Sequence, residues 1–177
     1  MNRTVVVTGG SGKLGRAVVA ALIDQEWTVV NFDRAPSPDT RARFIRTDLT
    51  DYGQVVEAFS GIDEVHGGVD AVVHLAAIPG AGFAPNVTTF DNNLLSTFHV
   101  FQAAARLLKI RNLVWASSET LLGYPFDSPP AYVPLDDDVP ATPQVVYAMA
   151  KDLEEQMARH YGRWDPQLKM IGLLDQR

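Results

Sequence analysis

Residues 4–15 of the chain read TVVVTGGSGKLG, and this stretch decides the fold. Its first five residues are β-branched and apolar apart from the threonines at each end, which is typical of a strand buried on both faces of a parallel sheet. Gly9, Gly12 and Gly15 follow at three-residue spacing and lead into the helical apolar pattern of residues 13–25. The stretch therefore predicts a strand, a tight turn and a helix.

The glycine spacing in this turn is typical of a dinucleotide-binding loop. In such a loop the first glycine allows the tight turn, the second lets the backbone approach a pyrophosphate, and the third lets helix and strand pack closely. Free N–H groups at the helix start then face the phosphates. A flexible connection with incidental glycines is the alternative, which the strand-turn-helix context disfavours. We expect the cofactor contacts here to come from Gly9, Ser11, Gly12, Lys13, Leu14 and Gly15.

The choice of dinucleotide depends on Asp33, which follows the second expected strand, residues 27–32. A carboxylate at this place can accept hydrogen bonds from the adenosine ribose and would repel a 2′-phosphate. This predicts NAD as the cofactor, with NADP less favoured. Arg34 and Lys13 keep NADP open because either cation can accommodate a phosphate, and Arg34 can equally stack on adenine.

Short apolar runs alternate with helical patterns along the rest of the chain. This alternation predicts an α/β fold, a Rossmann-like doubly wound parallel sheet of about six strands with helices on both faces, in the order 3-2-1-4-5-6. Residues 1–177 are expected to form one such domain. The further strands are expected over residues 43–46, 69–75, 112–116 and 168–174, and the further helices over residues 51–59, 88–109 and 143–161, the last with Pro143 in its first turn.

Composition excludes several classes of function. The 177 residues contain no cysteine, which excludes disulfides, thiolate catalysis and cysteine-ligated metals, and we expect no metal site. The formal net charge is −6 and no basic stripe is present, so nucleic acid is not an expected partner. Without a membrane span or a targeting segment, we expect a cytoplasmic protein that acts on a small molecule.

Tyr147 and Lys151 lie four residues apart in a helical segment and therefore share one face. A lysine ammonium close to a tyrosine favours the phenolate, so Tyr147 could exchange a proton with a hydroxyl or carbonyl group. Ser118, next to Ser117 at the end of the fifth strand, could hydrogen-bond the reacting oxygen. The alternatives are a half-buried tyrosine beside a solvated lysine, and serine hydroxyls that cap or turn the chain.

Taken together, these residues resemble the extended branch of the short-chain dehydrogenase/reductase superfamily, which includes sugar-nucleotide epimerases, dehydratases and uronate dehydrogenases. The turn at residues 8–15 is similar to that branch's T-G-x-x-G-x-x-G, and Tyr147 to Lys151 matches its Y-x-x-x-K. Further similar segments are Asp48-Leu49, His74-Leu75-Ala76-Ala77, residues 93–104 (NLLSTFHVFQAA) and Ser117-Ser118 with Gly123 behind.

The resemblance implies hydride transfer at a carbinol or carbonyl carbon. It implies Tyr147 as the acid/base and as a contact of the cofactor, and Lys151 as the ligand of the nicotinamide ribose. It also implies Ser118 as the residue that orients the substrate oxygen, and Asn93 as a support of the active-site helix. Asp48 and Leu49 would hold the adenine end, and Leu75, Ala76 and Ala77 would lie beside the cofactor. Two residues depart from the pattern: His99 replaces an asparagine, and Leu122 replaces a tyrosine before Gly123.

Three functions follow from these motifs. The first is an NAD-dependent oxidoreductase acting on a sugar-like or polycyclic small molecule. The second is a sugar-nucleotide epimerase or dehydratase with tightly bound NAD, and the third is a non-catalytic NAD-binding or sensor module. Family members continue into a C-terminal substrate-binding lobe that these 177 residues do not contain, so specificity stays open. The resemblance also implies a homodimer formed through the helices at residues 88–109 and 143–161.

Overall fold

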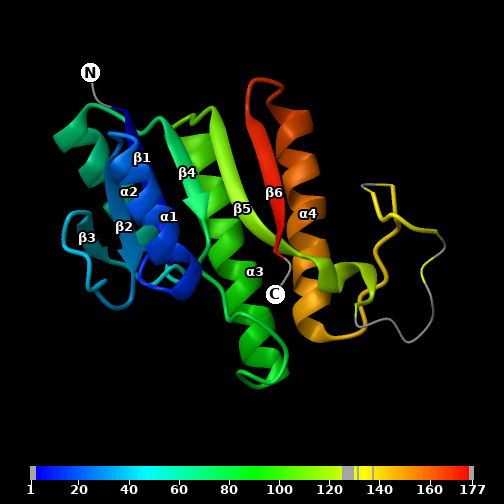
Figure 1. The fold of residues 1–177 in the computed structure, drawn as a ribbon. Coiled ribbons are helices and arrows are strands. Elements are labelled where there is room, and N and C mark those ends of the chain that lie inside the picture. The colour runs from blue at the N-terminus through cyan, green and yellow to red at the C-terminus, as the bar shows by residue number, and fades with distance from the viewer. Residues whose placement is uncertain (1–2, 125–129, 131, 137, 176–177) are drawn as a thin grey trace.

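A computed structural model describes residues 3–124, 130, 132–136 and 138–175. Six parallel strands form one sheet in the order β3-β2-β1-β4-β5-β6, which confirms the predicted fold class and strand order (Figure 1). The strands are β1 (Thr4–Thr8), β2 (Thr28–Asp33), β3 (Arg43–Arg46), β4 (Ala71–His74), β5 (Asn112–Ser118) and β6 (Lys169–Asp175). Because all six strands are parallel, their carboxyl ends meet at one edge, where the glycine turn lies.

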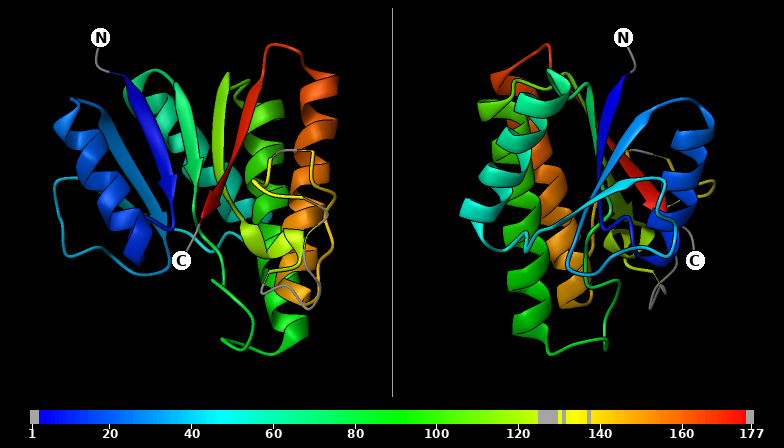
Figure 2. Two further views of the ribbon diagram at one scale, coloured as in Figure 1. Left: turned by 45° about the vertical axis from the view of Figure 1, so that its right-hand side comes forward. Right: turned by 90° about the vertical axis from the view of Figure 1, so that its left-hand side faces the viewer.

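Helices cover both faces of this sheet (Figure 2). They are α1 (Lys13–Asp24), α2 (Tyr52–His66), α3 (Asn86–Gln102), the π-helical turn η1 (Ala103–Leu107), the 3-10 turn η2 (Glu119–Leu122) and α4 (Val146–Trp164). Alternation along β1 divides the core between the two faces, as expected of a strand buried on both sides. Val5 and Val7 pack with α1, whereas Val6 packs in the larger cluster with α2, α3 and α4.

The centre of the larger cluster is aromatic. Phe101 is fully buried, and its ring meets Trp115 of β5 and Tyr161 of α4 edge to face, with centroids 5.5 and 6.1 Å apart. Edge-to-face ring pairs of this kind stabilise a fold beyond the contribution of the apolar surface that they bury. They fix α3 and α4 against β5, and these three elements carry Asn93, Tyr147, Lys151 and Ser118.

The start of α4 differs from the prediction. The helix begins at Val146 rather than at Pro143, because Val145 is extended, with φ −136° and ψ 157°. Thr142 is tied back to η2: its N–H donates to the Leu121 carbonyl and its hydroxyl to the Leu122 carbonyl, each over 2.8 Å. These hydrogen bonds hold Thr142 against η2, and the helix starts only after the extended Val145.

Two other helices differ in length. α2 was expected to end at Phe59 but continues to His66, because Ile62 adds a further buried position to its apolar face. The helix expected over residues 88–109 starts at Asn86 and changes to π-helical geometry at Ala103. Part of the acidic run at residues 136–138 lies outside the described residues, since Asp137 is not among them.

Within the described ranges, none of the helices combines the length and the apolar character that a membrane crossing requires.

Candidate functional site

Two glycines of the turn lie so close to other backbone atoms that neither admits a side chain. Gly9 has φ +71°, and a Cβ there would lie 2.6 Å from the Ala76 nitrogen. A Cβ at Gly15 would overlap the Gly9 carbonyl oxygen. By contrast, a Cβ at Gly12 would meet that oxygen alone, at 3.2 Å. Gly9 and Gly15 therefore serve packing, and Gly12 leaves open space beside the backbone.

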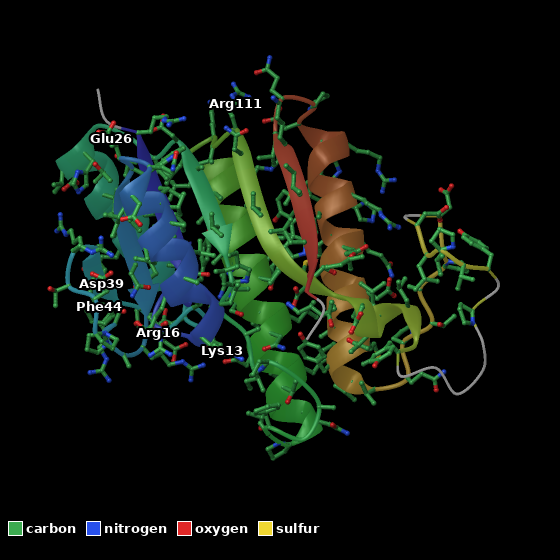
Figure 3. The ribbon with its side chains drawn as sticks, viewed as in Figure 1. Lys13, Arg16, Glu26, Asp39, Phe44 and Arg111 are labelled. Carbon is green, nitrogen blue, oxygen red and sulfur yellow. The ribbon has the colours of Figure 1, made fainter. Side chains whose placement is uncertain are left out.

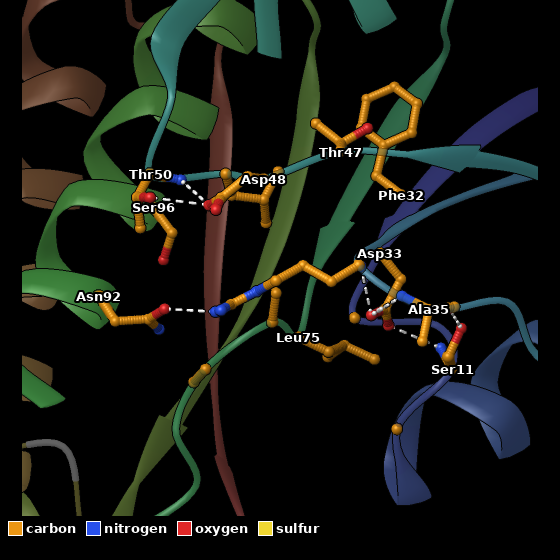
Figure 4. A pocket seen from close by; sticks show the side chains of 16 residues that line it. Ser11, Phe32, Asp33, Ala35, Thr47, Asp48, Thr50, Leu75, Asn92 and Ser96 are labelled. Atoms are coloured by element: carbon orange, nitrogen blue, oxygen red, sulfur yellow. Dashed lines mark hydrogen bonds between the residues drawn. The ribbon is translucent and has the colours of Figure 1, made fainter. Parts of the chain in front are cut away.

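Asp33 joins the end of β2 to this turn (Figure 4). One carboxylate oxygen accepts the Ser11 N–H over 3.0 Å, and the other accepts the Arg34 N–H over 2.7 Å. The Ser11 hydroxyl in turn donates to the Ala35 carbonyl over 2.6 Å. These bonds fix the carboxylate at the edge of the turn, in the place where the sequence predicts a ribose contact.

A cavity of about 350 Å³ opens beside Asp33. Its walls come from the glycine turn, the ends of β2 and β4, the segment between β3 and α2, and α3 (Figure 4). It brings together ten of the residues predicted to bind the cofactor: Gly9, Ser11, Gly12, Asp33, Arg34, Asp48, Leu49, Leu75, Ala76 and Ala77.

Five of the residues predicted to bind the cofactor do not line this cavity: Lys13, Leu14, Gly15, Tyr147 and Lys151. Lys13 is exposed at the start of α1 (Figure 3). Leu14 is also exposed, and Gly15 is buried against the turn. Tyr147 and Lys151 belong to α4, further along the same edge of the sheet.

Six residues of the wall were not predicted from the sequence: Phe32, Ala35, Thr47, Thr50, Asn92 and Ser96. Asn92 is the most informative of them, because its side-chain oxygen accepts a hydrogen bond from the Arg34 guanidinium over 2.6 Å. This bond links the end of β2 to α3 (Figure 4). Asn92 and Ser96 lie four residues apart and therefore share one face of α3. Ser96 lies three residues after the predicted Asn93, so helical periodicity could have found Ser96 but not Asn92.

Asp48 lies on the wall in a tight local turn. Its carboxylate accepts the Thr50 hydroxyl over 2.7 Å and the Thr50 N–H over 3.0 Å. These two bonds hold the pKa of Asp48 below its usual value, and the Arg34 guanidinium adds to the effect. His99 supports the neighbouring residue, since its Nδ1–H donates to the Leu49 carbonyl over 2.9 Å. His99, which stands where the family pattern has an asparagine, therefore supports the cavity wall.

A buried polar chain lies behind the cavity. His74 Nδ1 is 2.7 Å from the Thr8 hydroxyl, and His74 Nε2 is 3.0 Å from the Thr97 hydroxyl. Burial lowers the pKa of His74 to about 3, and the Lys151 ammonium acts in the same direction. His74 is therefore neutral at physiological pH, and it joins the ends of β1 and β4 to α3.

Asn93 clamps the segment that follows β4. Its side-chain oxygen accepts the Ile78 N–H over 2.8 Å, and its amide nitrogen donates to the Ile78 carbonyl over 3.0 Å. The side chain is fully buried. This two-point contact fixes α3 relative to Ala76 and Ala77, which line the cavity.

The two serines at the end of β5 face opposite sides of the sheet. The Ser118 hydroxyl lies 2.9 Å from the Thr120 hydroxyl and accepts the Thr120 N–H over 3.3 Å, so it caps η2. The Ser117 hydroxyl donates to a Glu155 carboxylate oxygen over 2.6 Å. The capping role that the sequence left open for Ser118 is thus present in the structure.

Tyr147 and Lys151 are both buried on α4, with 9% and 3% of their surfaces exposed. The Lys151 ammonium lies 6.0 Å from the centroid of the Tyr147 ring. It donates to the Ala116 carbonyl over 2.9 Å and to Glu154 over 2.8 Å. The lysine is therefore not solvated, and its charge lies within range of the phenol.

The class that this fold and site define is an α/β protein with a dinucleotide-type glycine turn, a cavity beside that turn and a buried tyrosine–lysine pair on α4. The model of the NAD dependent epimerase/dehydratase family matches residues 5–174, and the chain belongs to this family. Among the residues that the structure describes, no cluster of histidine, aspartate or glutamate is suited to hold a metal ion.

Curated relatives carry the names of epimerases. A bifunctional UDP-glucose 4-epimerase and UDP-xylose 4-epimerase of Arabidopsis thaliana is 26% identical over 97% of this chain and 51% of its own length. A UDP-glucose 4-epimerase of Bacillus subtilis is 26% identical over 88% of this chain and 47% of its own length. The chain thus spans about half the length of the curated relatives it matches.

Solved structures of similar proteins share the fold of this chain. A short-chain dehydrogenase/reductase superfamily protein from Agrobacterium tumefaciens, with bound NAD, is 31% identical with a TM-score of 0.81. The match covers 97% of this chain and 48% of that one. A Thermus thermophilus UDP-glucose 4-epimerase in complex with NAD is 26% identical with a TM-score of 0.83, over 97% of this chain and 54% of that one.

Proposed function

We propose that this chain binds NAD and supports hydride transfer at a hydroxyl or carbonyl carbon of a sugar-like small molecule. The observation that carries the proposal is the placement of two features at one edge of the sheet. The first is a cavity walled by the glycine turn and the fixed carboxylate of Asp33. The second is the buried pair of Tyr147 and Lys151 on α4.

The residues present fit a dinucleotide. The open side of Gly12 leaves room for a pyrophosphate beside the backbone, and Asp33 presents a carboxylate to a ribose. The Lys151 ammonium uses two of its three N–H donors within the protein, which leaves one for the nicotinamide ribose. When bound, NAD would accept and return the hydride.

The protein's own part in this chemistry is to move a proton. Tyr147 would take the proton of the substrate hydroxyl during oxidation and give it back during reduction. Ser118 would orient the reacting oxygen, which requires its hydroxyl to exchange the Thr120 partner for substrate. Asn93 would hold α3 in place through Ile78.

Calorimetry with NAD and NADP tests the cofactor, and the single substitution Tyr147→Phe tests the chemistry. We expect the unchanged protein to bind NAD more tightly than NADP. Tyr147→Phe should keep NAD binding and lose at least about a hundredfold in hydride-transfer rate, the usual contribution of an acid/base. Equal rates in the two proteins would refute the catalytic role, and absence of NAD binding would refute the proposal as a whole.

A second candidate function is epimerisation with NAD retained, and the epimerase names of the matched relatives favour it. Two readouts separate it from net oxidation. An oxidoreductase releases NADH in proportion to product, whereas an epimerase inverts a carbinol centre of a nucleotide sugar without net NADH release. If NAD binds but neither activity is found with nucleotide sugars and uronic acids, the third function remains, a non-catalytic NAD-binding module.

We further propose a cytoplasmic homodimer whose partner is a small molecule rather than nucleic acid, in keeping with the net charge of −6. Leu95 and Phe98 of α3 and Met149 of α4 are each about 40% exposed, and these helices pack together. Their apolar side chains would form the contact. Light scattering on the unchanged protein and on Phe98→Asp tests this, because the substitution should shift a dimer to monomers.

A further inference from the structure

Arg34 bridges two walls of the cavity beside Asp33. It follows β2 directly in the chain, whereas Asn92 belongs to α3, and both residues line the cavity. The Arg34 Nη2 donates to the side-chain oxygen of Asn92 over 2.6 Å. Figure 4 shows this bond reaching Asn92 on the helix. The guanidinium is therefore drawn to the α3 wall, although its side chain starts at the end of β2.

The orientation of the Asn92 amide is fixed from both ends. Its nitrogen donates to Asn93 Oδ1 over 3.0 Å, and that oxygen also accepts the Ile78 N–H over 2.8 Å. A guanidinium can only donate, so the atom that meets Arg34 must be the amide oxygen. Both contacts need the same orientation of the amide, and Asn92 therefore presents an acceptor to Arg34.

The Asp33 carboxylate, next to Arg34 in the chain, has other partners. One of its oxygens accepts the Ser11 N–H. The other accepts the N–H groups of Arg34 and Ala35, over 2.7 and 3.3 Å. The backbone of Arg34 thus binds this carboxylate, while its side chain bonds α3. The positive charge of Arg34 is held on a different wall of the cavity from the carboxylate.

An effect on Asp48 agrees with this placement of the charge. The pKa of Asp48 lies below its usual value because of hydrogen bonds from Thr50 and, to a smaller extent, the charge of Arg34. Asp48 lines the cavity from the segment between β3 and α2. The Arg34 charge therefore acts on the side of the cavity that Asn92 and Asp48 form.

The position of Arg34 bears on how the cavity distinguishes NAD from NADP. The two nucleotides differ in a phosphate on the 2′-oxygen of the adenosine ribose. A carboxylate after the second strand suits the free hydroxyl, and an arginine nearby suits the phosphate. Arg34 is the one cation among the described residues of the cavity wall. A turn of its guanidinium towards a 2′-phosphate beside Asp33 competes with the hydrogen bond to Asn92.

We propose that Asn92 is a positioning residue that strengthens the preference for NAD: it holds the Arg34 guanidinium at α3 and so withholds it from a 2′-phosphate beside Asp33. This inference rests on the proposed function, in which the cavity takes the adenosine part of NAD. Asp33 acts on the ribose directly, whereas Asn92 acts only through Arg34. The two effects are therefore separable by substitution.

The exposure of the two side chains sets the size of the effect. Hydrogen bonds to charged groups are stronger than those between neutral groups, but Arg34 is exposed and Asn92 is half-buried, so water competes for both. We expect the release of Arg34 to change the ratio of the two dissociation constants by about fivefold, less than a buried hydrogen bond to a charged group contributes.

Calorimetry with NAD and NADP tests the proposal in the whole chain. Asn92→Ala should lower the ratio of the NADP to the NAD dissociation constant by about fivefold, mainly through tighter binding of NADP. Adenosine 2′,5′-bisphosphate and AMP, which carry the two forms of the ribose, should show the same change. An unshifted ratio in Asn92→Ala would overturn the proposal.

Thr88→Ala is the matched control for this substitution. Thr88 is exposed on α3, one turn before Asn92, and lies outside the cavity wall. Its loss should leave the ratio unchanged. An equal fall of the ratio in Thr88→Ala and Asn92→Ala would assign the effect to α3 as a whole, and would overturn the proposal.

Two further variants separate the hold on Arg34 from a structural role of Asn92. In protein that already carries Arg34→Ala, the additional substitution Asn92→Ala should leave the ratio unchanged, because no guanidinium is left to hold. Asn92→Asp keeps an acceptor for Arg34 but loses the donor to Asn93, so its ratio should stay at or above that of the unchanged protein. A fall of the ratio in either case would mean that Asn92 acts through local packing, and would overturn the proposal.

Failure of the proposed function and failure of this role of Asn92 are distinguishable. If the ratio shifts as expected while no hydride transfer is found, the proposed function fails in its chemistry and the role of Asn92 is supported. If the unchanged protein binds NAD and transfers hydride while the ratio stays fixed in Asn92→Ala, only the role of Asn92 is refuted. Binding of neither nucleotide would refute both.

Discussion

Gly15 packs so closely on Gly9 that a Cβ at Gly15 would overlap the Gly9 carbonyl oxygen. The same carbonyl accepts the Gly12 N–H over 3.0 Å, which closes the turn. The first turn of α1 is thereby held against the end of β1.

Gly15→Ala should therefore destabilise the protein by about 1–3 kcal/mol, the usual effect of overpacking, and should weaken NAD binding as the turn shifts. Urea unfolding and calorimetry measure the two effects. Gly61→Ala in α2 is the control, because nothing lies within 4 Å of its added Cβ. It should stabilise the helix by about 0.5–1 kcal/mol. Equal effects at the two positions would contradict the packing role of Gly15.

Asp33→Asn should lower the preference for NAD over NADP by at least about tenfold. The substitution weakens a charge-assisted hydrogen bond to the ribose and removes the repulsion of a 2′-phosphate, while Arg34 stays in place. Calorimetry with both nucleotides gives the ratio. Asp39→Asn removes a carboxylate that pairs with Arg41, away from the cavity, and should leave the ratio unchanged. An unchanged ratio in Asp33→Asn would assign nucleotide choice to other residues.

Stability should fall on acidification because of His74. The unfolded chain takes up this proton near the ordinary pKa of 6.5, whereas the folded protein does so near about 3. Between these values the unfolded state binds more protons, so stability is lost as the pH falls, by up to about 1.4 kcal/mol per pH unit. Urea unfolding over this range should show a shallower slope in His74→Gln. Parallel slopes would show that His74 does not titrate in this way.

Asn93→Ala should destabilise the protein by about 2 kcal/mol, because it leaves both the N–H and the carbonyl of Ile78 without their partner. Asn92→Ala is the neighbouring control. That side chain is partly exposed; it accepts from the Arg34 guanidinium and donates to Asn93 Oδ1, and its loss leaves both hydrogen bonds between Asn93 and Ile78 in place, so stability should change by less than about 1 kcal/mol. Urea unfolding of both variants measures the difference, and the reverse order would show that the Ile78 clamp is not what holds α3.

Local patterns made much of this molecule predictable. The spacing of Gly9, Gly12 and Gly15 predicts a turn whose shape depends on sterics within a few residues. The strands were predicted from continuous apolar runs, which have few alternatives in a parallel sheet. The end of α3 was harder to predict, because no residue pattern in the sequence marks the change to π-helical geometry at Ala103.

Contacts between distant residues were not predictable from the pattern. Arg34 and Asn92 are 58 positions apart, and their hydrogen bond exists because β2 and α3 flank one cavity. The partner of Lys151 is a related case. Spacing places Tyr147 and Glu154 on the same helix face as Lys151, and burial against β5 then brings Glu154 within hydrogen-bond distance.

The hydrogen bond between Thr8 and His74 has a consequence for how the protein folds. The two residues are 66 positions apart, on neighbouring parallel strands. Parallel pairing of this kind requires closure of a long chain segment, with its loss of entropy, before any contact rewards it. We therefore expect the pairing of β1 with β4 to form late, and refolding to be slower than in a helical bundle of equal length.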